Sequence, residues 1–184
     1  MNRRPIPWRW HVAAALLLAL LSHALTVWAI PRLIMDRIIS IGREEARAQS
    51  GALVYLPPPI DHTQRRIVMP SPDLLYASCA FDLGEGPVRV QFNAAYPRYW
   101  SLALYAANSD TYLVRNDGDA GGRGIDLRIE ENRGTPAANR PGAPESVISP
   151  TRRGFLLLRL LVDDDPDLRA AAERARRGLR CFNE

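Results

Sequence analysis

A continuous apolar run over residues 10–30 constrains this chain more than any other feature of its sequence. The run has 21 residues, and a helix needs about 20 predominantly apolar residues to cross the hydrocarbon core of a membrane. Arg3, Arg4 and Arg9 precede it without any acidic residue, and positively charged flanks of this kind stay in the cytoplasm. The sequence therefore predicts a cytoplasmic tail over residues 1–9, a single transmembrane helix in a bacterial inner membrane, and a periplasmic remainder.

A cleaved signal peptide is the alternative to an anchor. Residues 27–29 form an acceptable cleavage site because they end on a small side chain, and the tail is positively charged. However, the apolar run is longer than the h-region of a signal peptide, and Leu33, Ile34 and Ile38 prolong its helical pattern. We favour the uncleaved anchor. Both interpretations export the rest of the chain.

The positive charge of the chain lies beside the apolar run. Residues 1–49 contain seven Arg and three acidic residues, whereas residues 50–184 contain seventeen of each. The exported part is therefore neutral and has no general attraction for polyanions. We predict no nucleic-acid partner. Every basic residue is Arg and none is Lys, which is typical of a GC-rich genome when the bias runs through the whole chain.

The exported part is predicted to contain three regions. The helical pattern continues over residues 31–49, which predicts a juxtamembrane stalk. A Ser-Gly pair ends that pattern, and the three prolines at 57–59 predict a stiff extended spacer over residues 50–64. We expect the folded domain to occupy residues 65–184.

The folded domain is predicted to be mainly β. Apolar side chains alternate with polar ones in some segments and run continuously in others, as in half-buried and fully buried strands. These strands are expected at residues 65–69, 74–83, 88–92, 98–106, 111–115, 125–130 and 155–162. Asp165 is placed to cap a C-terminal helix that begins at Pro166, with Leu168 and Leu179 on its apolar face. Seven or eight strands and one helix make a single mainly β domain.

Two cysteines, Cys79 and Cys181, lie on the predicted periplasmic side. An oxidising compartment permits a disulfide between them. The alternative is a buried free thiol at Cys79 and an unrelated exposed one at Cys181. The sequence leaves both open, because bridging depends on a Cα separation that spacing along the chain does not fix.

No arrangement of residues in the exported part predicts a reaction. It has one histidine, His62, without a plausible relay partner, so we predict no catalytic residues. Phosphate-binding, zinc-protease and paired-cysteine motifs are missing from the sequence. The acids at 163–165 precede a helix, where they complement its dipole. We therefore predict neither a metal site nor a cofactor.

The richest patch of side chains is aromatic, and its members are Tyr76, Tyr96, Tyr99, Trp100, Tyr105 and Tyr112. Along residues 98–106, Tyr99 and Tyr105 face one side of the expected strand, which Ser101 and Ala103 share. With Arg98 as a partner for an anion, this polar aromatic face is a candidate ligand-binding site. The alternative is ordinary core and cross-strand packing, with the hydroxyl groups reaching the surface.

Residues 68–78, Val-Met-Pro-Ser-Pro-Asp-Leu-Leu-Tyr-Ala-Ser, resemble the Pro-Asn-Pro-Asp-Thr-Leu-Tyr-Ser signature of the domain-of-unknown-function family 1254. The Gly-Pro-Val at 86–88 and the Arg-Tyr-Trp-Ser-Leu at 98–102 continue the resemblance, which covers about residues 50–180. Ser71 and Leu74 depart from the signature. The resemblance implies a β-sandwich. It also implies that Asp73 and Tyr76 belong to the site, although for Asp73 we favour a role in ordering the turn that enters the strand.

Longer relatives in that family carry a second β domain, family 1214, which we do not find here. This implies a partner in trans, namely a separate chain that carries the family-1214 domain. We therefore predict an uncharacterised non-enzymatic envelope protein whose periplasmic domain binds a partner protein or a small ligand through Asp73, Tyr76, Arg98, Tyr99 and Tyr105. The alternative is a subunit of an envelope enzyme whose site the partner chain completes.

Overall fold

One helix, α1 (Trp8–Ser50), joins the N-terminal part of the chain to the sheets. The computed structural model describes residues 7–60, 70–93, 95–131, 143–163 and 165–184. The predicted transmembrane segment and stalk form a single uninterrupted helix, which continues through Pro31. Gly51 ends it with a left-handed backbone (φ 70°) and donates its N–H to the Arg47 carbonyl, a common helix stop. Within the described residues, α1 is the one helix long and apolar enough to cross a membrane.

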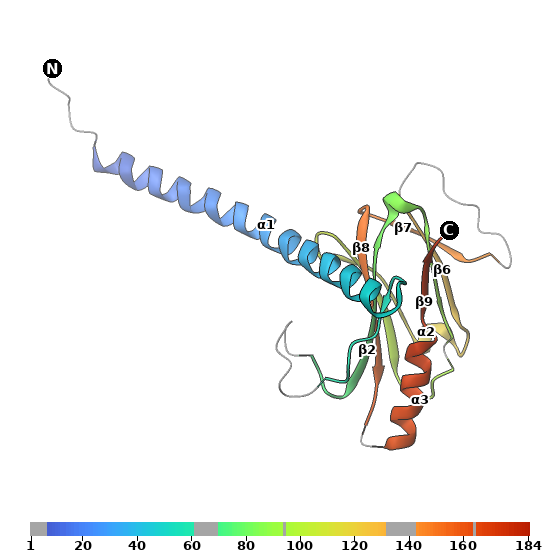
Figure 1. Cartoon of the computed structure of the whole chain (residues 1–184). Helices are drawn as coiled ribbons and strands as arrows, with labels where there is room; N and C mark the ends of the chain where they lie inside the picture. The colour runs from blue at the N-terminus through green and yellow to red at the C-terminus, as the bar shows by residue number, and fades with distance from the viewer. Residues whose placement is uncertain (1–6, 61–69, 94, 132–142, 164) are drawn as a thin grey trace.

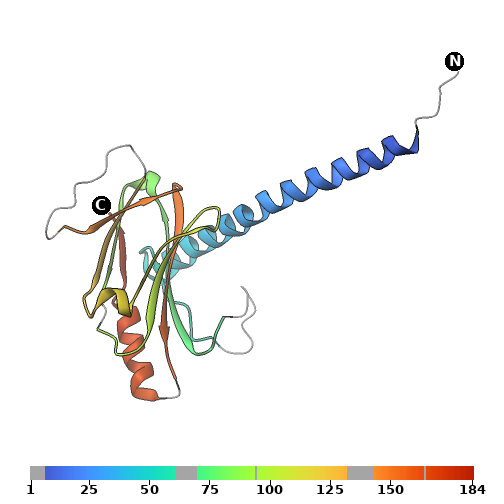
Figure 2. The ribbon, with the colours of Figure 1, turned by 180° about the vertical axis from the view of Figure 1, so that it is seen from behind.

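The two ends of α1 have different surroundings. Its N-terminal part points away from the rest of the molecule in both views (Figures 1 and 2), and its apolar side chains there are exposed. Its C-terminal part lies on a sheet, where Met35, Ile39 and Ala46 are buried. A Cβ at Gly42 would lie 3.2 Å from the Cβ of Ala80, so the glycine allows the helix backbone to approach the sheet closely.

The sheet beneath α1 has five strands in the order β1-β2-β8-β4-β5, all antiparallel. Their bounds are β1 (Val54–Tyr55), β2 (Leu74–Asp82), β8 (Arg153–Leu161), β4 (Trp100–Ala106) and β5 (Thr111–Asn116). The central strands β2 and β8 pair over nine residues each, from Leu74 opposite Leu161 to Asp82 opposite Arg153. The predicted strands 74–83, 98–106, 111–115 and 155–162 are confirmed here, with ends shifted by one or two residues.

The second sheet has four strands in the order β7-β6-β3-β9. They are β7 (Glu145–Ser149), β6 (Ile125–Glu131), β3 (Val88–Phe92) and β9 (Arg180–Asn183), and only β6 and β7 pair in parallel. In β3, Val88, Val90 and Phe92 are buried whereas Arg89 and Gln91 are partly exposed, as their alternation predicts. Two short helices connect strands, a 3-10 turn (Leu83–Glu85) and α2 (Asp117–Ala120).

One hydrophobic cluster takes side chains from both sheets. The rings of Phe92 on β3 and Trp100 on β4 meet edge to face, with centroids 5.0 Å apart. The disulfide Cys79–Cys181 joins β2 to β9. A second link joins the edge strands β5 and β7 of the two sheets, where Arg115 and Glu145 form an ion pair with a nitrogen-to-oxygen distance of 2.5 Å. The helix α3 (Pro166–Arg177) adds Leu168 and Ala172 to the same cluster.

The C-terminal helix is confirmed at its beginning and shorter than expected at its end. The Asp165 carboxylate accepts a hydrogen bond from the Asp167 N–H, and Pro166 is the first residue of α3. However, Leu179 does not continue the helix. The chain turns at Gly178 and forms β9, whose Cys181 pairs with Val90 of β3. The strands β1 and β9 are not predicted because they are short, and β7 is not predicted because its apolar and polar residues do not alternate.

Some of the sequence predictions fall on residues that the structure does not describe. The strand over residues 65–69, the start of the domain at 65, His62 and the centre of the acidic run at 164 lie outside the described residues. Residues 31–49 and 50–64 are expected to be stalk and spacer. In the described part of those ranges, the C-terminal part of α1 contacts the sheet, and Val54 and Tyr55 pair with Cys79 and Ser78.

Candidate functional site

The outer face of the five-stranded sheet carries the polar side chains of the predicted site. Register fixes which residues lie side by side: Arg159 on β8 is opposite Tyr76 on β2 and opposite Ser101 on β4. The neighbouring row contains Ser78, Leu157 and Ala103. We call these six residues the Arg159 face. It lies beyond the part of the sheet that α1 covers, where Met35 and Ile39 pack with Ala80.

Arg159 lies at the centre of this face. Its side chain is half-buried, and one of its terminal nitrogens donates a hydrogen bond of 2.8 Å to the Tyr105 hydroxyl. Tyr105 is two residues beyond Ala103 on the same strand, and the small side chain of Ala103 leaves room for the contact. Tyr105 also packs against the cluster under α1, so it connects the Arg159 face to the part of the sheet that α1 covers.

The predicted ligand-binding residues divide into two groups. Tyr76 and Tyr105 lie on the outer face with Arg159, and Tyr99 is exposed (47%) just before β4. Arg98 is exposed and forms an ion pair with the Asp163 carboxylate, with a nitrogen-to-oxygen distance of 3.7 Å. This pair does not involve Arg159. Whether any of them binds a ligand stays a prediction.

Asp73 has a local role in the structure. Its backbone N–H donates to the Ser71 hydroxyl at 3.4 Å, and its carbonyl accepts from the Val162 N–H at 2.8 Å. The Tyr76 hydroxyl accepts from the Ser71 N–H at 3.1 Å. These bonds order the entry to β2 through the backbone of Asp73 and the hydroxyl groups of Ser71 and Tyr76. A turn-ordering role for the Asp73 side chain stays a prediction. A role in binding stays a prediction.

Sequence reasoning missed Arg159, although a signal for it exists. Arg159 is the one charged residue in the otherwise apolar stretch 154–162. Charged residues in strands buried on one face are uncommon unless they have a partner or a function. The leucines of this stretch predict a buried strand. That prediction does not explain why one arginine lies among them.

Tyr112 belongs to the predicted aromatic patch but not to the Arg159 face. It packs against the hydrophobic cluster between the sheets, and this burial raises the pKa of its hydroxyl to about 12. The hydroxyl is therefore neutral at any physiological pH. Tyr96, also in the patch, is buried and donates its hydroxyl to the Leu161 carbonyl. Both residues match the packing alternative for the aromatic patch.

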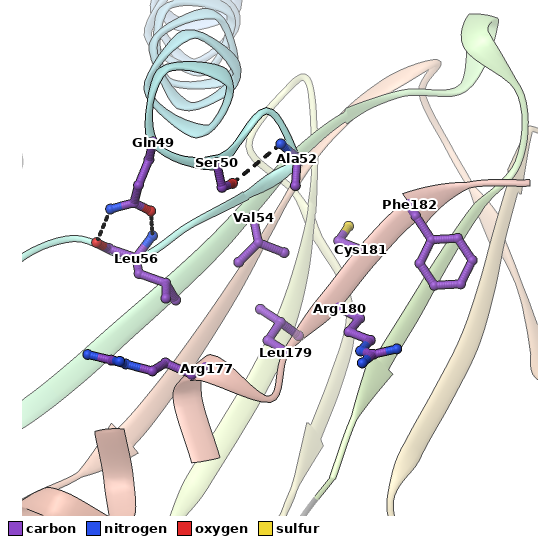
Figure 3. Close-up of a pocket in the computed structure, with 10 residues that line it drawn as sticks. All are labelled: Gln49, Ser50, Ala52, Val54, Leu56, Arg177, Leu179, Arg180, Cys181 and Phe182. Carbon is purple, nitrogen blue, oxygen red and sulfur yellow. Dashed lines mark hydrogen bonds between the residues drawn. The ribbon is translucent and has the colours of Figure 1, made fainter. Parts of the chain in front are cut away.

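A separate open pocket lies where the ends of α1 and α3 meet β1 and β9 (Figure 3). It has a volume of about 450 Å³, and apolar side chains such as Val54, Leu179 and Phe182 line it. The Gln49 amide both donates to and accepts from the backbone of Leu56, at 3.0 and 2.9 Å, so it is occupied in holding the chain after α1. None of the predicted ligand-binding residues lines this pocket.

The described residues contain no group of three or more His, Cys, Asp or Glu side chains that could hold a metal ion. His11 and His23 are both exposed on α1. The polar groups of the candidate site are the hydroxyl groups of Tyr76, Ser101 and Tyr105 and the guanidinium of Arg159. Such groups bind and orient an anion through hydrogen bonds and charge.

Comparison with known proteins decides the family. The family described as "Protein of unknown function (DUF1254)" matches residues 51–182. The chain belongs to DUF1254. The resemblance inferred from the proline-rich signature is thus confirmed, and the match includes β1 and the disulfide. No curated protein matches the chain.

Two solved structures resemble this DUF1254 chain at 16% identity. The VPA0106 protein from Vibrio parahaemolyticus aligns with a TM-score of 0.59 over 85% of this chain. The alignment spans only 37% of the Vibrio protein, so the likeness concerns the fold of one part of it. An uncharacterised protein from Burkholderia cenocepacia has a TM-score of 0.41, over 59% of this chain and 32% of its own.

Proposed function

We propose that this DUF1254 chain is a single-pass protein of the bacterial inner membrane that holds a periplasmic binding domain. The observation that carries the proposal is the division of α1 into an exposed apolar part and a part that packs on the sheet. Exposed leucines along a long helix are unfavourable in water and favourable in lipid. The arginines before the apolar run favour a cytoplasmic N-terminus, and the Cys79–Cys181 disulfide is suited to the oxidising periplasm.

In this proposal the two sheets form a β-sandwich. Support comes from the hydrophobic cluster that both sheets share and from the two links across it, the disulfide between β2 and β9 and the ion pair between β5 and β7. Sheets that pack face to face share an apolar interior in this way. The inner faces of the two sheets are already buried against each other, so we expect binding on an outer face.

Topology tests the membrane part of the proposal. Trypsin added to spheroplasts should digest the domain at exposed arginines such as Arg123 and Arg174 and leave a protected fragment with the N-terminal tag. A domain that stays intact until the membrane is dissolved would contradict the periplasmic location. A mature chain without the N-terminal tag, released by carbonate washing, would instead indicate a cleaved signal peptide.

We further propose that the outer face of the five-stranded sheet binds a partner or a small ligand, the partner being a separate chain that carries the family-1214 domain. Support comes from the exposed apolar side chains Tyr99 and Val114, each 47% exposed, on the side of β4 and β5 that faces away from the shared core. Residues of this kind are enriched in the centres of interfaces. The similar Vibrio protein is longer than the aligned part.

Co-purification from mild detergent tests the partner. Val114→Glu should abolish recovery of a second β protein, because it places a charge in the proposed interface. Ile148→Glu is a matched control, since Ile148 is 41% exposed on β7 of the other sheet. A solitary monomer, or equal loss in both variants, would contradict the proposal. A complex that turns over a substrate which neither chain converts alone would favour the enzyme alternative.

A further inference from the structure

Arg159 differs from the other buried arginines of the structure. Seven arginines in the described residues are buried or half-buried. Six of them have a carboxylate oxygen within 4.0 Å. These six are Arg43, Arg89, Arg115, Arg128, Arg153 and Arg176. Arg159 is the seventh, and it donates a hydrogen bond to the Tyr105 hydroxyl.

An arginine in this position has unused binding capacity. A guanidinium has five N–H donors, and Tyr105 accepts from one of its nitrogens. The row across the sheet adds Tyr76 and Ser101 as neighbours, and both are hydroxyl-bearing residues rather than carboxylates. A charge that is partly removed from water without a counter-ion costs free energy, and an anion that binds there recovers it.

Two hydroxyl groups next to Arg159 can also donate. The Tyr105 hydroxyl accepts from Arg159, so its own proton is free for an acceptor. Ser101 is 2% exposed, and its hydroxyl oxygen has no hydrogen-bond partner among the residues that the structure describes. Buried hydroxyl groups normally have partners. Ser101 is thus a second, independent indication that a polar group of a ligand belongs on this face.

We propose that the Arg159 face binds the carboxylate of a small amphipathic molecule. Arg159 holds the carboxylate through paired N–H donors, and the Tyr105 hydroxyl donates to the same group. The apolar body of the ligand lies against Tyr99 and Leu161, which are 47% and 39% exposed beside this row. One uncompensated positive charge matches a monoanion. The inference rests on the ligand-binding part of the proposed function and names the class of ligand.

Equilibrium dialysis of the full chain in detergent tests this, with radiolabelled benzoate as the probe and benzamide as its neutral match. We expect saturable binding of one benzoate per chain, and benzamide binding at least about tenfold weaker, because a hydrogen bond to a charged group contributes about 1.5–3 kcal/mol. Arg159→Gln should weaken benzoate binding by about tenfold or more. Arg180→Gln is the control, since Arg180 is exposed on β9 and, among the described residues, no ion pair with a carboxylate involves it.

A structural role for Arg159 predicts a different result. If Arg159 stabilises the sheet, Arg159→Gln should lower the urea midpoint of the ligand-free protein. We expect no decrease, because the replaced charge has no carboxylate partner among the described residues. We expect Tyr105→Phe to weaken benzoate binding about tenfold while leaving the fold intact, because the lost hydroxyl donates to a charged group.

Four results would overturn the inference: no saturable benzoate binding, equal binding by Arg159→Gln, equal binding of benzamide, or displacement of benzoate by an equal concentration of inorganic phosphate. The last would assign the face to phosphate groups instead. The two proposals can fail separately. If benzoate does not bind but trypsin still digests the domain from the periplasmic side, the ligand inference is wrong and the membrane proposal stands.

Discussion

The disulfide between Cys79 and Cys181 gives the strongest prediction about stability. It joins β2 of one sheet to β9 of the other, and it closes a loop with a sequence separation of 102 residues. In the chain-entropy model a loop of about 100 residues corresponds to about 4.7 kcal/mol of stabilisation, through restriction of the unfolded chain. Both cysteines are buried, at 0% and 5% exposure, so alanines would also leave a small loss of packing.

The double substitution Cys79→Ala/Cys181→Ala should therefore lower the free energy of unfolding by about 3–5 kcal/mol. With a urea dependence of about 2 kcal/mol per molar, the midpoint of unfolding should fall by about 2 M. Native domains are stable by only about 5–15 kcal/mol, so this loss is a large share of the total.

The assay uses the fluorescence of Trp100, which is buried between the sheets. Trp8, Trp10 and Trp28 lie on α1 and are replaced by Phe in a common background, so that the signal reports on the sheets alone. The chain stays in detergent throughout. Thiol labelling of the unreduced, denatured protein shows in parallel that the background protein contains no free thiol.

A midpoint that moves by less than about 0.3 M, in protein whose thiols are shown to be bonded, would refute the reasoning. It would mean that the unfolded chain is already restricted, or that the two strands stay paired without the bond. Two labelled cysteines in the unreduced protein would refute the disulfide itself.

Three further predictions use the same urea assay. Ile39→Ala should cost about 2–4 kcal/mol, because Ile39 is fully buried under α1, and a cost below about 1 kcal/mol would mean that α1 contributes little to the sheet. Hydrogen bonds from Arg89 hold the pKa of the Asp126 carboxyl below its ordinary value of 3.8, so the pair stabilises the fold above that pH and loses its effect as the pH falls through the lowered pKa. Asp126→Asn should thus flatten the loss of stability below about pH 4, and an unchanged acid profile would contradict this. Arg98→Gln should change stability by less than about 0.5 kcal/mol, since its pair with Asp163 is exposed on both sides, and a larger loss would show a structural role.

The periodicity of the sequence predicts the strands that are long and regular. Val88, Val90 and Phe92 alternate with polar residues, and β3 has the predicted bounds. The strands β1 and β9, with two and four residues, have too few residues to show a period. The strand β7 has five residues, as β3 does, but apolar and polar residues do not alternate in its sequence. The pairing of all three strands depends on neighbours that are distant in the chain. Leu179 illustrates the limit: its spacing fits the apolar face of α3, but the chain leaves the helix at Gly178.

The candidate site was predicted in part for the same reason. Alternation along one strand shows that Tyr99, Ser101 and Tyr105 share a face, and the structure agrees for the residues within β4. It does not show that β8 lies beside β4, and so it cannot bring Arg159 to Ser101 and Tyr105. Nor can a sequence show that an arginine lacks a carboxylate, because that depends on every element packed around it.

The sequence by itself determines the long apolar helix, the neutral charge of residues 50–184, the main strands and the family, because each depends on composition or on a local period. The tertiary structure alone decides that Cys79 meets Cys181, that the C-terminal part of α1 packs on the sheet, and that Arg159 lies among hydroxyl groups. These are contacts between residues far apart in the chain. They follow from strand order and register, which no local pattern encodes.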